Sequence, residues 1–149
     1  MEIGLNNQVG LSTFLSEKYG ITRKDYFNKV LDIDPAQVIK NYEIPVSFVT
    51  KLMANKNLIL LTSAPKVWQE KVINYLGLTG VFKNIYTGED FKDKSEIFEL
   101  LSKKSIPSEM ISIGDQEITD ILPARIFGIN GFLIENPDNF SKLALILNI

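Results

Sequence analysis

Residues 111–120 have the sequence ISIGDQEITD, in which an apolar run ends at Gly114-Asp115 and a second aspartate, Asp120, follows five residues later. A short apolar run bounded by turn residues is typical of a buried strand. Gly114 allows a sharp backbone turn, and Asp120 falls just over one turn into the next predicted helix, from which it can reach back toward Asp115. Two carboxylates at one strand end suit Mg²⁺, which takes oxygen ligands. The alternative is a capping Asp115 beside a solvated Asp120.

Helices and strands alternate around this segment. Apolar runs at 58–61, 82–87, 110–113 and 131–134 predict strands, and the segments between them, together with one that Pro45 opens and one at 140–146, predict helices. Such alternation is typical of right-handed βαβ units, so we predict an α/β fold with a mostly parallel sheet and helices on both faces. In such sheets, ligands bind beyond the carboxyl ends of the strands.

Two further polar groups follow strands or begin helices. Thr62-Ser63 ends the first apolar run, where a hydroxyl and the free amides of a helix N-terminus can hold a phosphate oxygen. A simple helix cap is the alternative. The run Lys92-Asp93-Lys94 begins another predicted helix, where a lysine is electrostatically unfavourable unless it faces an anion. One lysine there could neutralise a phosphate, and the alternative is a solvated charge run.

Residues 1–43 differ from the remainder. They predict helices and no clear strand, with Thr22 and Asp25 forming a weak capping box and a break at residues 32–35. We therefore predict a helical, cap-like segment over 1–43 and an α/β core over 44–149.

Composition excludes several classes of protein. The chain has 149 residues, 16 basic and 18 acidic, for a net charge of −2, which gives no electrostatic case for binding nucleic acid or an anionic membrane. It has no cysteine and no histidine, which excludes disulfides, thiol nucleophiles, Ser-His-Asp catalysis and zinc sites built on those residues. No apolar run approaches 18 residues and the first residues lack the pattern of a secretion signal, so we expect a cytoplasmic protein.

Taken in order, these segments resemble the haloacid dehalogenase-like superfamily, most members of which are Mg²⁺-dependent phosphatases with an aspartate nucleophile and a Rossmann-like fold. Residues 58–63 resemble its second motif, Lys94 its third (with Lys92 open as the alternative), and residues 111–120 its fourth. The resemblance implies that Thr62 or Ser63 hydrogen-bonds the phosphate and that Lys94 neutralises it. It also implies that Asp115 ligates Mg²⁺, with Asp120 supporting that site.

Within the superfamily, residues 19–27, 62–64 and 76–82 are most similar to members related to pyrimidine 5′-nucleotidases, in which a small helical cap precedes the second motif. The expected substrate is therefore a small phosphate ester, with a nucleotide as one candidate.

The sequence departs from the family at the first motif, an Asp-x-Asp that follows an apolar strand and carries the nucleophile. Its only Asp-x-Asp is Asp32-Ile33-Asp34, which follows a predicted helix and is followed by Pro35, so we interpret it as a loop, with a nucleophile motif as the alternative. In this fold the strand of that motif lies in mid-sheet, so its absence would leave exposed edges. The chain is then a truncated or a degenerate phosphatase, or another chain or segment fills the gap. Two further interpretations are a catalytically silent binding or assembly protein and a homodimer formed through an exposed sheet edge.

Overall fold

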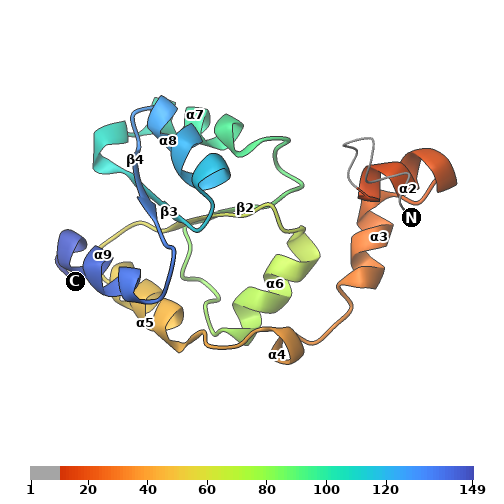
Figure 1. Ribbon diagram of the computed structural model, residues 1–149, viewed down its shortest axis with the longest axis horizontal. Helices are drawn as coiled ribbons and strands as arrows, with labels where there is room; N and C mark the ends of the chain where they lie inside the picture. Colours follow the sequence, from red (N-terminus) through yellow and green to blue (C-terminus); the bar gives the residue numbers. More distant parts are fainter. Residues whose placement is uncertain (1–10) are drawn as a thin grey trace.

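The computed structural model describes residues 11–149 and contains parallel β-strands covered by helices (Figure 1). Strand β1 (Ile59–Leu61) pairs in parallel with β2 (Asn84–Tyr86), and β3 (Ile111–Gly114) pairs in parallel with β4 (Asn130–Leu133). The predicted α/β class and the parallel direction are therefore confirmed. The strands of the described part form two separate two-stranded sheets, however, and not the single continuous sheet that the alternation predicts.

The helices of the α/β part follow the predicted alternation, with differences at their ends. They are α5 (Glu43–Met53), α6 (Lys66–Tyr75), α7 (Lys94–Lys104), α8 (Leu122–Ile126) and α9 (Asp138–Leu147). Helix α5 begins two residues before Pro45, and Pro65 lies at the N-cap of α6, just before the helix. Before α8, residues Glu117–Ile121 form a π-helical turn, and Pro107–Glu109 form a 3-10 turn before β3.

Two apolar clusters lie between strands and helices. On one face, Phe48 and Leu52 of α5 pack with Leu143 of α9 against side chains of β3 and β4. On the other, Phe98 of α7 and Ala124 of α8 pack with partly buried side chains that include Leu61 of β1. The strands thus form a middle layer with helices on both faces, as the alternation predicts.

The N-terminal part of the described chain is helical and lies to one side of the strands (Figure 1). It contains α2 (Leu11–Tyr19), α3 (Arg23–Val30) and α4 (Pro35–Val38). Thr22 is the N-cap of α3, because its Oγ1 accepts a hydrogen bond of 3.1 Å from the Asp25 amide. The Asp25 carboxylate accepts from the Thr22 hydroxyl and not from its backbone amide, so only half of the predicted capping box forms. The division into a cap-like segment and a core stays a prediction, and residues 1–10 of that segment lie outside the described residues.

Helix α6 fixes the chain that follows α3. Lys71 Nζ lies 3.1 Å from the carbonyl oxygen of Leu31 and 3.2 Å from Asp32 Oδ1. Asp34 caps α4 through a hydrogen bond of 3.0 Å from the Ala36 amide.

Within residues 11–149, every helix is too short or too polar to cross a lipid bilayer.

Candidate functional site

A cleft of about 760 Å³ separates the two pairs of strands, and we call it the β1–β3 cleft. Its walls are residues 57–62, which include β1, and residues 109–115, which include β3. Side chains of α7 and the π-helical turn also line it. Thr62, Lys94, Asp115 and Asp120 all line this cleft. Ser63, the fifth predicted site residue, is exposed and is not part of the lining. The geometry therefore brings together residues that are far apart in the sequence, while their roles stay predictions.

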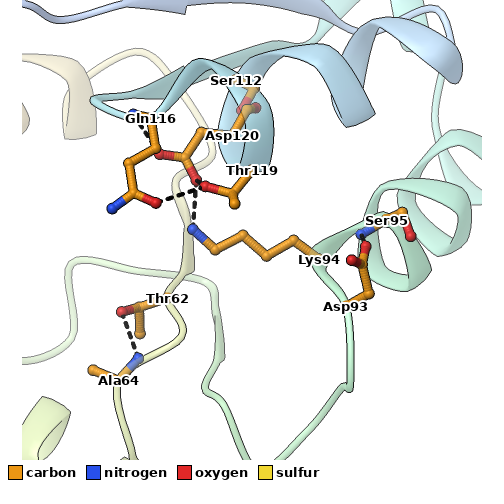
Figure 2. Close-up of polar contacts among 9 residues, drawn as sticks. All are labelled: Thr62, Ala64, Asp93, Lys94, Ser95, Ser112, Gln116, Thr119 and Asp120. Carbon is orange, nitrogen blue, oxygen red and sulfur yellow. Dashed lines mark hydrogen bonds and ion pairs between the residues drawn. The ribbon is translucent and has the colours of Figure 1, made fainter. Parts of the chain in front are cut away.

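Lys94 lies at the first position of α7, and its ammonium group contacts a carboxylate. Its Nζ lies 2.5 Å from Asp120 Oδ1, and the two side chains are only 14% and 11% exposed (Figure 2). A lysine at a helix N-terminus is disfavoured by the helix dipole, and this carboxylate compensates for that cost. The helix start itself is fixed by Asp93, whose carboxylate accepts a hydrogen bond of 2.7 Å from the Ser95 amide in a capping box with Glu96.

These capping contacts shift the ionisation of Asp93. The hydrogen bond with the Ser95 side chain, and then the one from the Ser95 amide, lower the pKa of Asp93 below its ordinary value. The neighbouring Lys92 is exposed and does not line the cleft, whereas Lys94 does. The geometry therefore favours Lys94 over Lys92 as the cation of this site.

Asp120 is buried, and both of its carboxylate oxygens are engaged (Figure 2). Besides Lys94, Oδ1 accepts a hydrogen bond of 3.1 Å from Thr119 Oγ1, and Oδ2 accepts one of 3.2 Å from the Gln116 amide. Ser112 Oγ donates to the Asp120 carbonyl oxygen at 2.7 Å, which joins the turn to β3. Together these contacts fix the carboxylate in position.

Gly114 makes this position of Asp120 possible. A Cβ atom on Gly114 would overlap the side chain of Asp120, so the carboxylate packs directly on the end of β3 only because no side chain stands there. The sequence pattern predicts Gly114 as a turn residue; the structure assigns it a packing role instead. Ser112, Gln116 and Thr119 are contacts of the site that the sequence analysis did not single out, and only their nearness to Asp115 and Asp120 in the chain could have indicated them.

Asp115 differs from Asp120, because it is exposed at the edge of the cleft. No hydrogen bond or ion pair fixes its carboxylate within the described residues, where the geometry also forms no group of three or more carboxylates that could hold a metal. Mg²⁺ in proteins is commonly held by one or two carboxylates, with waters and substrate phosphate completing six ligands. Asp115 fits that requirement as the direct ligand, and Asp120, already bound to Lys94, fits a supporting position.

Thr62 lies just beyond β1, on the other side of the cleft (Figure 2). Its backbone amide donates to the carbonyl of Tyr86 at 2.9 Å, and its Oγ1 accepts a hydrogen bond of 3.1 Å from the Ala64 amide. A hydroxyl group has one proton to donate besides its lone pairs. Because the Ala64 amide uses a lone pair, the Thr62 proton remains available for an acceptor in the cleft.

Asp32 and Asp34 do not line the β1–β3 cleft. Asp32 is bound to Lys71 and Asp34 caps α4, as described above. This position matches the interpretation of residues 32–34 as a loop.

Comparison with known proteins finds solved structures with a similar fold. The chain is similar to the HAD-hydrolase YfnB of Bacillus subtilis, solved with bound magnesium, with a TM-score of 0.64 and 20% identity over 91% of this chain and 68% of that one. It is also similar to a HAD phosphatase of Thermococcus onnurineus, with a TM-score of 0.61 and 18% identity over 89% of this chain and 84% of that one. A search of curated proteins finds no match. Residues 3–134 match the family described as haloacid dehalogenase-like hydrolase, and we conclude that the chain belongs to this family.

Proposed function

We propose that the β1–β3 cleft is the phosphate site of a Mg²⁺-dependent phosphatase that acts on small phosphate esters, with nucleotides as the first candidates. One observation carries the proposal: a hydroxyl, an ammonium group and a free carboxylate, from Thr62, Lys94 and Asp115, line one cleft at the carboxyl ends of parallel strands. This is where ligands bind in open α/β sheets. Similarity to pyrimidine 5′-nucleotidases, inferred from sequence motifs, supports nucleotides.

Each residue has a distinct part in this proposal. Thr62 donates its free hydroxyl proton to a phosphate oxygen. Lys94 has three N–H donors, of which one contacts Asp120, and its remaining donors neutralise the phosphate charge. Asp115 holds the metal ion, which when bound supplies Lewis-acid stabilisation of phosphate charge. Asp120 is a positioning residue that orients Lys94 and the turn after β3.

Transfer through a phosphorylated aspartate requires a carboxylate in line with the phosphorus atom. Asp120 is engaged by Lys94, and Asp32, bound to Lys71, lies outside the cleft lining. This arrangement supports the second candidate, a binding protein that holds a phosphorylated molecule without hydrolysing it. The two candidates share the phosphate site and differ only in turnover.

Binding of inorganic phosphate, measured by calorimetry with and without Mg²⁺, tests the phosphate site that both candidate functions share. We expect Thr62→Val and Lys94→Met to weaken binding about tenfold or more, because a hydrogen bond to a charged group contributes about 1.5–3 kcal/mol. Ser63→Ala and Lys92→Met are matched controls that should leave the affinity unchanged. Equal binding by all four variants would exclude the cleft as the phosphate site.

Hydrolysis of p-nitrophenyl phosphate then separates the candidates. Mg²⁺-dependent turnover that Asp115→Asn abolishes and Asp32→Asn preserves supports the phosphatase. Turnover abolished by Asp32→Asn would make residues 32–34 the nucleophile motif and overturn their interpretation as a loop. Phosphate binding without any turnover supports the silent binding protein.

A further inference from the structure

A row of exposed apolar residues lies on the helical segment that follows β3. The π-helical turn and α8 together span residues 117–126 without a break. Ile118, Leu122 and Ile126 are four residues apart in this segment, so they lie on one side of it. They are 78%, 44% and 77% exposed. We call these three residues the α8 stripe.

The opposite side of the same segment is already used for packing. Asp120, Ile121 and Ala124 are buried, and Ala124 packs with Phe98 of α7 in the second apolar cluster. A surface helix of a globular protein is typically polar on the side that faces water, but here that side carries the α8 stripe. A contiguous apolar patch on a water-facing surface marks a site of interaction.

One acidic and one basic residue stand beside the two ends of the α8 stripe. Glu117 directly precedes Ile118, and Arg125 directly precedes Ile126. Both charged residues are exposed, and among residues 11–149 neither is engaged in a salt bridge. Arg125 is held only by a long hydrogen bond of 3.4 Å to the Gly131 carbonyl. The surface is therefore apolar in the middle, acidic beside its first end and basic beside its last.

Such a surface is complementary to itself when it is turned end for end. A two-fold axis that passes near Leu122 would place two α8 stripes antiparallel, with Ile118 of each copy beside Ile126 of the other. The same axis would bring Glu117 of each copy toward Arg125 of the other, which forms two equivalent ion pairs. Side chains four residues apart form a ridge, and two such ridges interdigitate when their helices cross at about −50°.

We propose that the α8 stripe is the interface of a symmetric, antiparallel homodimer of this chain. Residues 1–10 are a poorer occupant of the stripe, because their only charged side chain is Glu2 and they offer no basic side chain to Glu117. The dimer is weak, with a dissociation constant on the order of 100 µM, because three apolar residues and two ion pairs bury less than the roughly 800 Å² per partner of a typical stable interface.

This interface differs from the sheet edge through which the sequence analysis expects a homodimer, and it does not depend on the proposed phosphate chemistry. Sedimentation equilibrium of the whole chain from about 10 µM to about 1 mM covers the expected dissociation constant. We expect the fraction of dimer to rise with concentration over this range.

A substitution at the centre of the α8 stripe tests its place in the interface. Leu122→Glu should weaken dimerisation about tenfold or more, because it removes an apolar contact and places two carboxylates beside the two-fold axis. Leu145→Glu is the matched control, since it makes the same change of side chain and charge at a position of α9 that is 80% exposed. It should leave the dissociation constant unchanged.

Reversal of the flanking charges tests the antiparallel direction. Glu117→Arg and Arg125→Glu should each weaken the dimer about fivefold, because each change replaces both ion pairs by like charges. The double variant should restore the affinity of the wild type. In a parallel dimer each charge would face its own equivalent, so that neither single reversal would weaken the contact. Sodium chloride at about 1 M, which shortens the Debye length to about 3 Å, should reduce the difference between single and double variants.

Four outcomes would overturn the proposal. The first is a chain that stays monomeric up to about 1 mM, well above the expected dissociation constant. The second is a dimer that Leu122→Glu leaves intact, which would place the interface on another face such as a strand edge. The third is a loss in the single reversals that the double variant does not restore. The fourth is a monomer in which nuclear Overhauser contacts join the Ile118 or Ile126 methyl groups to residues 1–10, because a segment of the same chain would then cover the stripe.

Discussion

Lys94 and Asp120 are 26 residues apart in the chain, yet Lys94 Nζ lies 2.5 Å from Asp120 Oδ1 between two largely buried side chains. The contact joins the start of α7 to the turn that follows β3. A buried ion pair of this kind contributes little net stability, but the loss of one partner leaves the other charge buried and uncompensated. The pair therefore fixes the position of both residues at the edge of the β1–β3 cleft.

Replacing Lys94 by methionine should lower the free energy of unfolding by about 3 kcal/mol, because the Asp120 carboxylate then remains buried without its cation. Urea denaturation measures this change. The control is Lys103→Met, which breaks the exposed pair with Glu99, whose side chain is 50% exposed, and should change stability by less than about 0.5 kcal/mol. The double variant Lys94→Met, Asp120→Asn should recover part of the loss, and strict additivity would contradict the coupling.

Replacing Gly114 by alanine should destabilise the protein by about 2 kcal/mol, because the new Cβ displaces the Asp120 side chain. The amide signal of Gln116, which donates to Asp120, should shift with it. Gly80→Ala is the control: its φ is +79° with nothing within 4 Å of a built Cβ, so only backbone strain of about 1 kcal/mol applies. An unchanged Gln116 signal in Gly114→Ala would show that Asp120 does not depend on the glycine.

The lowered pKa of Asp93 predicts a pH dependence of stability. Its folded-state pKa lies below the unfolded value, so its contribution is present above the ordinary pKa of an aspartyl carboxyl group and is lost as pH falls through the lowered value. Melting temperatures of the wild type and Asp93→Asn, measured from pH 7 to pH 2.5, should therefore converge toward the acid end. A difference between the two proteins that does not change with pH would contradict this role of the carboxylate.

Two leucines of α9 test the packing of the first apolar cluster. Leu143 has no exposed surface, so Leu143→Ala should cost about 3 kcal/mol through lost burial and the cavity it leaves. Leu145 on the same helix is 80% exposed, and Leu145→Ala should change stability by less than about 0.5 kcal/mol. Equal losses in chemical denaturation would mean that α9 packs through a different face.

Features that depend on neighbouring residues could be predicted from the sequence. The apolar run before Thr62, the N-cap at Thr22 and the turn at Gly114-Asp115 all rest on contacts within a few positions. The parallel α/β class could also be predicted, from the alternation of strands and helices. That class predicts that polar residues at strand ends lie together, and Thr62, Lys94, Asp115 and Asp120 do line one cleft.

The choice between Lys92 and Lys94 could not be settled in this way. It depends on Asp93 being the N-cap, which places Lys94 in the first turn of α7, and on the tertiary position of Asp120. The π-helical turn at Glu117–Ile121 was also missed, because its apolar spacing resembles that of an ordinary helix. The turn is distinguished by its backbone bond, since the Leu122 amide donates to the Glu117 carbonyl, five residues earlier in the chain.

The separation of the strands into two pairs was outside the reach of local patterns for a different reason. An apolar run indicates that a strand is buried, but it does not specify which strand lies beside it, since pairing joins residues far apart in the chain.

The separation of the described strands into two pairs also bears on how this protein behaves in concentrated solution, because each pair ends in strand edges. Unpaired strands with apolar side chains are templates on which unrelated or partly folded chains can grow into aggregates. Recovery of native protein from denaturant should therefore fall as its concentration rises.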